Sequence, residues 1–92
     1  MVSAVVLINV QRGQVNETAQ SLLEIEGVSE VYSVTGKYDL VALLRLQRYE
    51  DLADVVTGKM IKIPAILKTN TLMAFQSYSR ADLQQAWDIG IE

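Results

Sequence analysis

The side chains that most often carry out chemistry in proteins are missing from this chain. Its 92 residues include no histidine and no cysteine. This excludes a serine–histidine–aspartate triad, a cysteine nucleophile, disulfides, and histidine or thiolate metal sites. Two carboxylate pairs, Glu24 with Glu26 and Asp51 with Asp54, fall in stretches with helical spacing. Such pairs are typical of solvated helix surfaces, and nothing marks either one as an acid–base couple.

Charge and composition narrow the possible partners. The chain has 8 basic and 11 acidic residues and a net charge of −3, so we expect no direct binding to nucleic acid. Lys59, Lys62 and Lys68 form only a mild basic cluster, expected to be solvated. The chain is 50% hydrophobic and 21% charged, which favours one folded domain over a disordered tail. No leader or spanning segment is visible, so we expect a cytoplasmic protein with no membrane partner.

The pattern of apolar residues predicts the element order β-α-β-β-α-β. Apolar or alternating runs predict strands, and apolar residues at helical spacing predict helices. The expected strands cover residues 3–10, 28–35, 39–47 and 67–79, and the expected helices cover 17–26 and 49–63. Asn16 is the expected N-cap of the first helix, and Pro64 ends the second.

This order predicts an α+β, ferredoxin-like fold with a four-stranded antiparallel sheet. Right-handed crossovers place the first and third strands at the centre and the other two at the edges. The chain divides into a domain at residues 1–79 and a C-terminal helical tail at 80–92. We expect Met60, Met73 and Phe75 in the core.

The central strands are apolar on both faces, although two helices can cover only one. In the first strand, Val5 and Leu7 alternate with Ala4, Val6, Ile8 and Val10. Soluble monomers rarely expose a large apolar patch, so we expect the sheet to pack face to face on a second copy. The alternative is that the C-terminal helix, with Leu83 and Trp87, covers this face within one chain.

The segment TGKYDLVALLRL, residues 35–46, places Gly-x-Tyr-Asp between two expected strands. Together with IEGVSEVYSVTGKYDL and the Thr-x-Thr segment at 69–71, it resembles the RAM domain of Lrp/AsnC (feast/famine) transcription regulators. The resemblance spans residues 3–79. That family usually carries an N-terminal helix-turn-helix domain, and nothing precedes the first strand here. The resemblance therefore implies a stand-alone effector-binding module, without the DNA binding of its relatives.

The resemblance also implies an effector cleft between subunits, with Gly36, Tyr38, Asp39, Thr69 and Thr71 as candidate ligand-binding residues and no cofactor. A loop glycine lets amides approach a ligand carboxylate, an aspartate can pair with an ammonium, and threonine hydroxyls add short polar contacts. Each residue also has a structural alternative. The glycine and aspartate can simply shape their own turn, the tyrosine can be a rim aromatic, and the threonines can be ordinary strand residues.

The leading interpretation is a non-enzymatic module that oligomerises and binds a small amino acid. Its partners are then a second copy, as a homodimer or a larger ring, the effector, and a full-length Lrp/AsnC-type regulator. One alternative is a pure assembly module that joins such regulators without ligand. Another is a dimeric α/β-barrel enzyme, which could use only Asp39 and Tyr38 in place of histidine.

Overall fold

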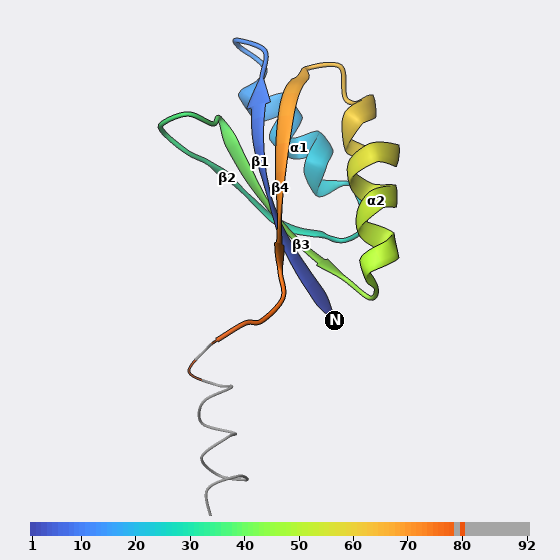
Figure 1. Ribbon diagram of the computed structural model, residues 1–92. Coiled ribbons are helices and arrows are strands. Elements are labelled where there is room, and N and C mark those ends of the chain that lie inside the picture. The colour runs from blue at the N-terminus through green and yellow to red at the C-terminus, as the bar shows by residue number, and fades with distance from the viewer. Residues whose placement is uncertain (79, 81–92) are drawn as a thin grey trace, which may run out of the picture.

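A computed structural model describes residues 1–78 and 80, and it has the predicted element order (Figure 1). The elements are β1 (Val2–Val10), α1 (Val15–Leu23), β2 (Val28–Ser33), β3 (Leu40–Leu46), α2 (Tyr49–Gly58), the 3₁₀ turn η1 (Met60–Lys62) and β4 (Ile66–Ala74). The α+β, ferredoxin-like fold is thus confirmed. The alternative, a cover from the C-terminal helix with Leu83 and Trp87, falls outside the described residues.

The four strands form one antiparallel sheet in the order β2-β3-β1-β4. The first and third strands are central, as predicted. β1 pairs with β3 on one side, where Ile8 lies opposite Leu40, and with β4 on the other, where Ile8 lies opposite Thr69. The β2–β3 loop therefore sits beside the C-terminal end of β1.

The core lies between the two helices and one face of the sheet. Every second residue of β1 and β3 is buried, as expected for strands whose side chains alternate between faces. Leu22 from α1, Leu52 and Val55 from α2, and Met60 from η1 complete the same cluster. Both helices therefore cover one face, and the opposite face carries no helix among the described residues.

The observed helices differ from the predicted ones: α1 differs at both ends, since it ends at Leu23 instead of residue 26, and α2 differs at its C-terminal end. Helix α1 begins at Val15 after Gln14, whose carbonyl accepts the backbone N–H of Thr18 at 3.0 Å. Asn16 lies inside the helix, so its prediction as the N-cap was wrong. Helix α2 ends at Gly58 instead of residue 63, because Lys59 leaves helical geometry at φ −120°. The chain then tightens into η1, which buries Met60 as predicted.

Strand β4 is shorter than predicted because its partner ends. Ala74 lies opposite Ser3, close to the start of β1, so residues 75–78 have little left to pair with, and residue 79 lies outside the described residues. Phe75 is 90% exposed and Met73 is 48% exposed, so their prediction as core residues was wrong. Met73 lies on an edge strand, where neighbours pack from one side only. Strands β2 and β3 agree with the prediction to within two residues at each end.

Candidate functional site

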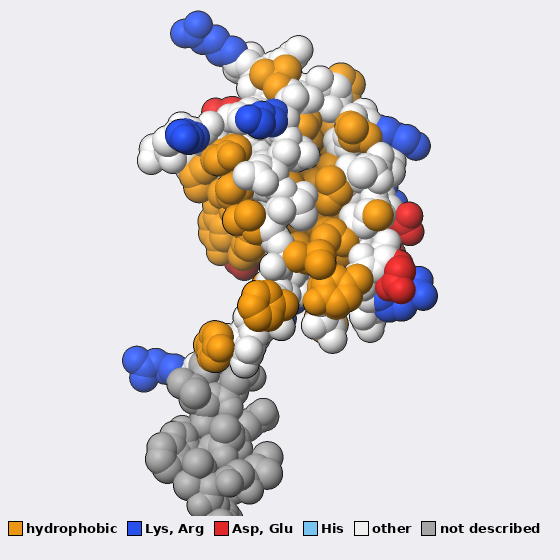
Figure 2. Space-filling model, in the orientation of Figure 1, with side chains coloured by type: hydrophobic (Ala, Val, Ile, Leu, Met, Phe, Trp, Pro, Cys, Tyr) orange, Lys and Arg blue, Asp and Glu red, His pale blue; other side chains and the backbone are white. Residues whose placement is uncertain are grey.

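The face of the sheet opposite the helices is apolar at its centre, and we call it the open face. The register places half-exposed or exposed apolar side chains there from all four strands: Val5 and Leu7 of β1, Tyr32 of β2, Val41 and Leu43 of β3, and Leu72 of β4. Figure 2 shows hydrophobic side chains gathered on the side of the sheet away from α2. The prediction that the central strands are apolar on both faces is confirmed.

Asp39 ties the β2–β3 loop to the end of β1. Its carboxylate accepts a hydrogen bond from the Val10 N–H at 2.9 Å, and its own N–H donates to the Ile8 carbonyl at 2.9 Å. The Asp39 carbonyl also accepts the N–H of Val34 at 3.1 Å, which closes the loop. The side chain therefore has a structural role, and it reaches β1 instead of turning back on its own loop.

Two asparagines on the open face donate hydrogen bonds to the same loop. Asn9 donates to the Lys37 carbonyl at 2.8 Å, and Asn70 donates to the Tyr38 hydroxyl at 3.3 Å. Tyr38 thus reaches from the loop past β1 to β4, at the end of the open face. Sequence reasoning missed both asparagines. The available signal was a polar residue interrupting an otherwise apolar or alternating strand.

Gly36 lies at the exposed tip of this loop with φ +110°. A Cβ built on it would meet nothing within 4 Å, so the backbone conformation alone favours glycine here. This matches the structural alternative for Gly36. It also leaves the loop amides accessible to a ligand.

Thr69 and Thr71 lie on the other face of β4 from Asn70. Their partners across the ladder are Ile8 and Val6, which are both fully buried, so the two threonines face the helix side and are half-buried. They make no hydrogen bond to the loop within the part of the chain described. The structure therefore brings Gly36, Tyr38 and Asp39 together but leaves the threonines apart from them.

Charged groups sit at the margin of the open face. On β2, the Tyr32 hydroxyl donates to the Glu30 carboxylate at 3.0 Å. This hydrogen bond, with the nearby negative charge, raises the pKa of Tyr32 above the ordinary tyrosine value. Arg45 of β3 and Lys68 of β4 occupy the same face by register. The open face therefore has an apolar centre and a polar edge, which is the usual anatomy of a protein interface.

Neither a metal site nor a membrane span is found in residues 1–78 and 80. No group of three acidic side chains there could hold an ion, and no helix is long and apolar enough to cross a bilayer. The arrangement that does exist is a loop fastened to one end of an apolar sheet face. Its groups can donate and accept hydrogen bonds and present one carboxylate. The class defined by this fold and site is a ligand-binding or association domain.

The comparisons with known proteins identify the family. The family model for the Lrp/AsnC ligand binding domain matches residues 3–83. The chain therefore belongs to the Lrp/AsnC ligand-binding domain family, which consists of domains of transcription regulators and not of enzymes. The predicted resemblance to the RAM domain is confirmed.

Individual relatives agree with this assignment. The HTH-type transcriptional regulator FL11 of Pyrococcus abyssi is 33% identical over 78 residues, which are 82% of this chain and 49% of that protein. The chain thus spans about half the length of the curated relatives it matches. A crystal structure of TTHA0845 from Thermus thermophilus is 45% identical, with a TM-score of 0.82, covering 87% of this chain and 100% of that one.

The structure of a third relative was determined in complex with an amino acid. The feast or famine regulatory protein Rv3291c from M. tuberculosis, complexed with L-methionine, is 26% identical with a TM-score of 0.72. The alignment covers 87% of this chain and 54% of that one.

Proposed function

We propose that this chain binds a small amino acid between subunits and that two copies assemble through their open faces. The observation that carries the proposal is the loop at residues 35–39. Asn9 and Asn70 of the open face and the N–H of Val10 hold it in place, while its Gly36 tip stays exposed. Family membership and the L-methionine complex of a relative support the choice of ligand class.

Assembly follows from the energetics of the open face. Burying about 600 Å² of apolar surface contributes about 15 kcal/mol before the costs of association are subtracted. A second copy offers the same apolar centre and a polar edge of both signs, with Glu30 on one edge strand and Lys68 on the other. Two faces related by a two-fold axis can therefore match apolar centre to apolar centre.

The loop has groups suited to each end of a zwitterion. Exposed amides around Gly36 can donate to a carboxylate, and the charge of Asp39 can attract an ammonium even while one of its oxygens holds the Val10 N–H. Thr69 and Thr71 face away from Tyr38 within one chain. Their participation requires a ligand at the edge of β4 or a contribution from another copy, which agrees with a cleft between subunits.

The test is calorimetric titration of L-methionine and a panel of other amino acids into the unmodified protein and its Asp39→Asn variant. Removing a charge-assisted contact costs about 1.5–3 kcal/mol, so binding should weaken about 10- to 150-fold while the oligomer persists. Glu24→Gln, an exposed charge change on the helix side, should leave the affinity unchanged.

Two results would contradict this assignment. Equal affinity for Asp39→Asn and the unmodified protein would remove Asp39 from the site. If Asp39→Asn does not fold, the bond to Val10 is its main role, and Thr71→Val then tests the ligand site. No binding by any amino acid would favour the ligand-free assembly module.

The same open face could pair with the matching domain of a longer regulator. The observation favouring this second partner is that the chain matches about half of a regulator such as FL11. Mixing the chain with a full-length Lrp/AsnC-type regulator should then give mixed oligomers in size-exclusion chromatography. We also propose that the chain alone does not bind duplex DNA, because its net charge is −3 and phosphate contacts need clustered basic residues.

A further inference from the structure

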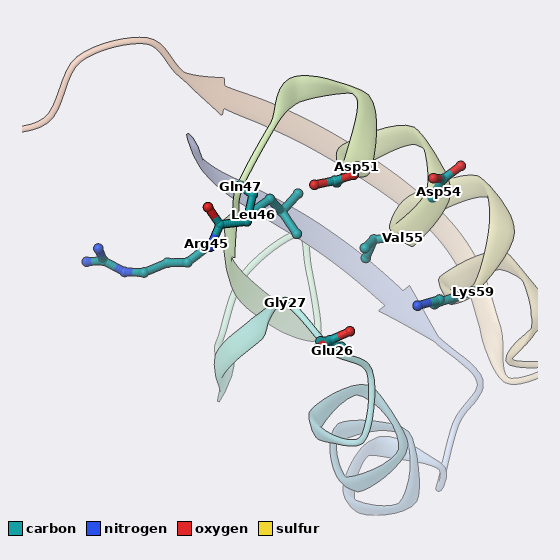
Figure 3. Close-up of a pocket in the computed structure, with 9 residues that line it drawn as sticks. All are labelled: Glu26, Gly27, Arg45, Leu46, Gln47, Asp51, Asp54, Val55 and Lys59. Atoms are coloured by element: carbon teal, nitrogen blue, oxygen red, sulfur yellow. The ribbon is translucent and has the colours of Figure 1, made fainter. Parts of the chain in front are cut away.

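Two cavities of similar volume lie on the helix side of the sheet, and they differ in how deeply their polar groups are buried. One, of about 360 Å³, lies beside Leu46, and its charged side chains are exposed or half-buried (Figure 3). Asp51 there already pairs with Arg48 at 3.4 Å, and Arg45 points away from the cavity. The other, of about 370 Å³, lies between α1 and the turn that leads into β4, and a buried threonine lines it.

The second cavity has two walls that come from different parts of the chain. The first wall consists of side chains about one turn apart on one side of α1: Gln14, Glu17, Thr18 and Ser21. The second wall is the mostly apolar turn into β4: Ile63, Pro64 and Ala65. The backbone N–H of Gln11, which also lines the cavity, donates to the Ala65 carbonyl at 2.8 Å. This hydrogen bond joins the two walls at one end.

Thr18 is the buried residue of this lining. It is 2% exposed, whereas the other lining residues are half-buried or exposed. Its Oγ1 has no hydrogen-bond partner in residues 1–78 and 80. Buried hydroxyls are normally paired in folded proteins, because burial without a partner is costly. A group that enters the cavity can supply the partner that Thr18 lacks.

The start of α1 contributes to the electrostatics of the same cavity. No side chain caps the helix at Gln14, and the N–H of Thr18 is the first in α1 to bond to a carbonyl, that of Gln14. The N–H groups before it therefore have no acceptor within the helix, and this end carries a partial positive charge. Glu17, in the first turn, is the one charged residue among the described lining residues. Its negative charge is thus partly offset by the helix.

We propose that this cavity binds a small neutral polyhydroxy compound, such as a monosaccharide. Hydroxyl groups both donate and accept, so they can pair with the Thr18 hydroxyl, the Glu17 carboxylate and the amides of Gln11 and Gln14. The C–H groups of a sugar ring suit the apolar wall at Pro64. The volume is at the lower end of the range of about 300–1,000 Å³ for ligand sites, which fits one small ring.

Other ligand classes match these groups less well. The Glu17 carboxylate repels an anion, and the positive end of α1 opposes a cation. A hydrocarbon would leave the Thr18 hydroxyl without a partner. The cavity also shares no lining residue with the loop at residues 35–39, so this proposal does not rest on the proposed function.

The test follows backbone amide chemical shifts of the ¹⁵N-labelled protein during titrations with D-glucose, D-glucuronate and cyclohexanol. D-Glucose should shift the amides of Thr18 and Ala65, and its affinity should not depend on salt, because it carries no charge. D-Glucuronate should bind more weakly, because its carboxylate meets Glu17. Cyclohexanol has a single hydroxyl and should bind about 2- to 12-fold more weakly for each hydrogen bond that is lost.

A matched pair of threonine variants tests the role of the buried hydroxyl. Thr18→Val keeps the shape of the side chain and should weaken D-glucose binding about 2- to 12-fold. It should not lower the midpoint of thermal unfolding without sugar, because the hydroxyl that it removes has no partner. Thr57→Val is the control, since Thr57 lies on α2 outside the cavity and donates to the Ala53 carbonyl. It should leave the affinity for D-glucose unchanged.

Three results would overturn the proposal. The first is no amide shift at Thr18 or Ala65 with D-glucose, which would leave water as the occupant of the cavity. The second is equal affinity for D-glucose in Thr18→Val and the unmodified protein. The third is a lower unfolding midpoint of Thr18→Val without sugar, which would show that the hydroxyl has a partner in the chain. Amide shifts at residues 36–39 with L-methionine report the proposed function separately, so either proposal can fail alone.

Discussion

The two faces of the sheet are built from the same strands but meet different surroundings. On the helix side, Val6, Ile8 and Leu40 are fully buried by α1, α2 and η1. On the open face, their neighbours Val5, Leu7 and Val41 remain half-exposed. The side chains are chemically alike on both faces, so their type does not decide burial. The difference shows that an apolar strand pattern specifies contact surfaces, and that residues 1–78 and 80 supply only one of the two covers.

The position of the polar residues supports this view of the open face. Asn9 and Asn70 stand at its end, where they hold the β2–β3 loop through Lys37 and Tyr38. A surface that only faces solvent does not require such ordered hydrogen bonds beside an apolar centre. The open face and the candidate ligand loop therefore form one continuous region.

The largest expected effect is on the free energy of unfolding, when two neighbouring side chains of β1, one on each face of the sheet, are truncated. Ile8→Ala removes a fully buried side chain and should lower the free energy of unfolding by about 2–5 kcal/mol. Leu7→Ala, its neighbour on the open face, should cost clearly less at protein concentrations low enough to separate the copies. Urea unfolding of both variants checks the pair. Equal losses at low concentration would contradict the proposed difference between the faces.

Two glycines give the next comparison. Gly27→Ala places a Cβ within 2.5 Å of buried Leu46 and also strains a positive φ, so it should cost about 3 kcal/mol of stability. Gly36→Ala has a similar φ but open space around the added atom, and should cost about 1–2 kcal/mol. Thermal and urea unfolding measure both. A larger loss at Gly36 would mean that the loop is packed more tightly than the structure shows.

The smallest expected effect is a change in the pKa of Tyr32 on the open face. The hydrogen bond from Tyr32 to Glu30, and then the charge of Glu30, raise the pKa of Tyr32. Glu30→Gln should lower that pKa toward the ordinary tyrosine value, which ultraviolet absorbance of the tyrosinate can follow. Tyr32→Phe identifies which of the tyrosine transitions belongs to this residue. An unchanged transition in Glu30→Gln would show that the two side chains do not interact.

The sequence predicted the element order well because it depends on local patterns, and the strand order followed from that order and the right-handed crossovers. Continuous apolar runs mark the central strands β1 and β3, and helical spacing marks α1 and α2. The ends of the helices and strands were harder to predict. The start of α1 and the end of α2 depend on turns at Gln14 and Lys59, and the end of β4 depends on where its partner strand stops.

The candidate site was only partly predictable. The Gly-x-Tyr-Asp pattern located the loop, since its residues are adjacent in the chain. The contacts that fasten the loop could not be predicted, because the Asn70–Tyr38 hydrogen bond joins residues 32 positions apart and the Asn9–Lys37 hydrogen bond joins residues 28 positions apart. The face occupied by Thr69 and Thr71 also depends on the register of β4 against β1, which alternation alone does not fix.

Sedimentation equilibrium tests the central claim, that a second copy covers the open face. At micromolar concentration, the unmodified protein should have at least twice the mass of its 10.2 kDa chain. Leu43→Asp, at the centre of the open face, should give a folded monomer by sedimentation and circular dichroism, and Leu23→Asp on exposed α1 should stay assembled. A monomeric unmodified protein, or a Leu43→Asp variant that keeps its full oligomeric mass, would contradict the account.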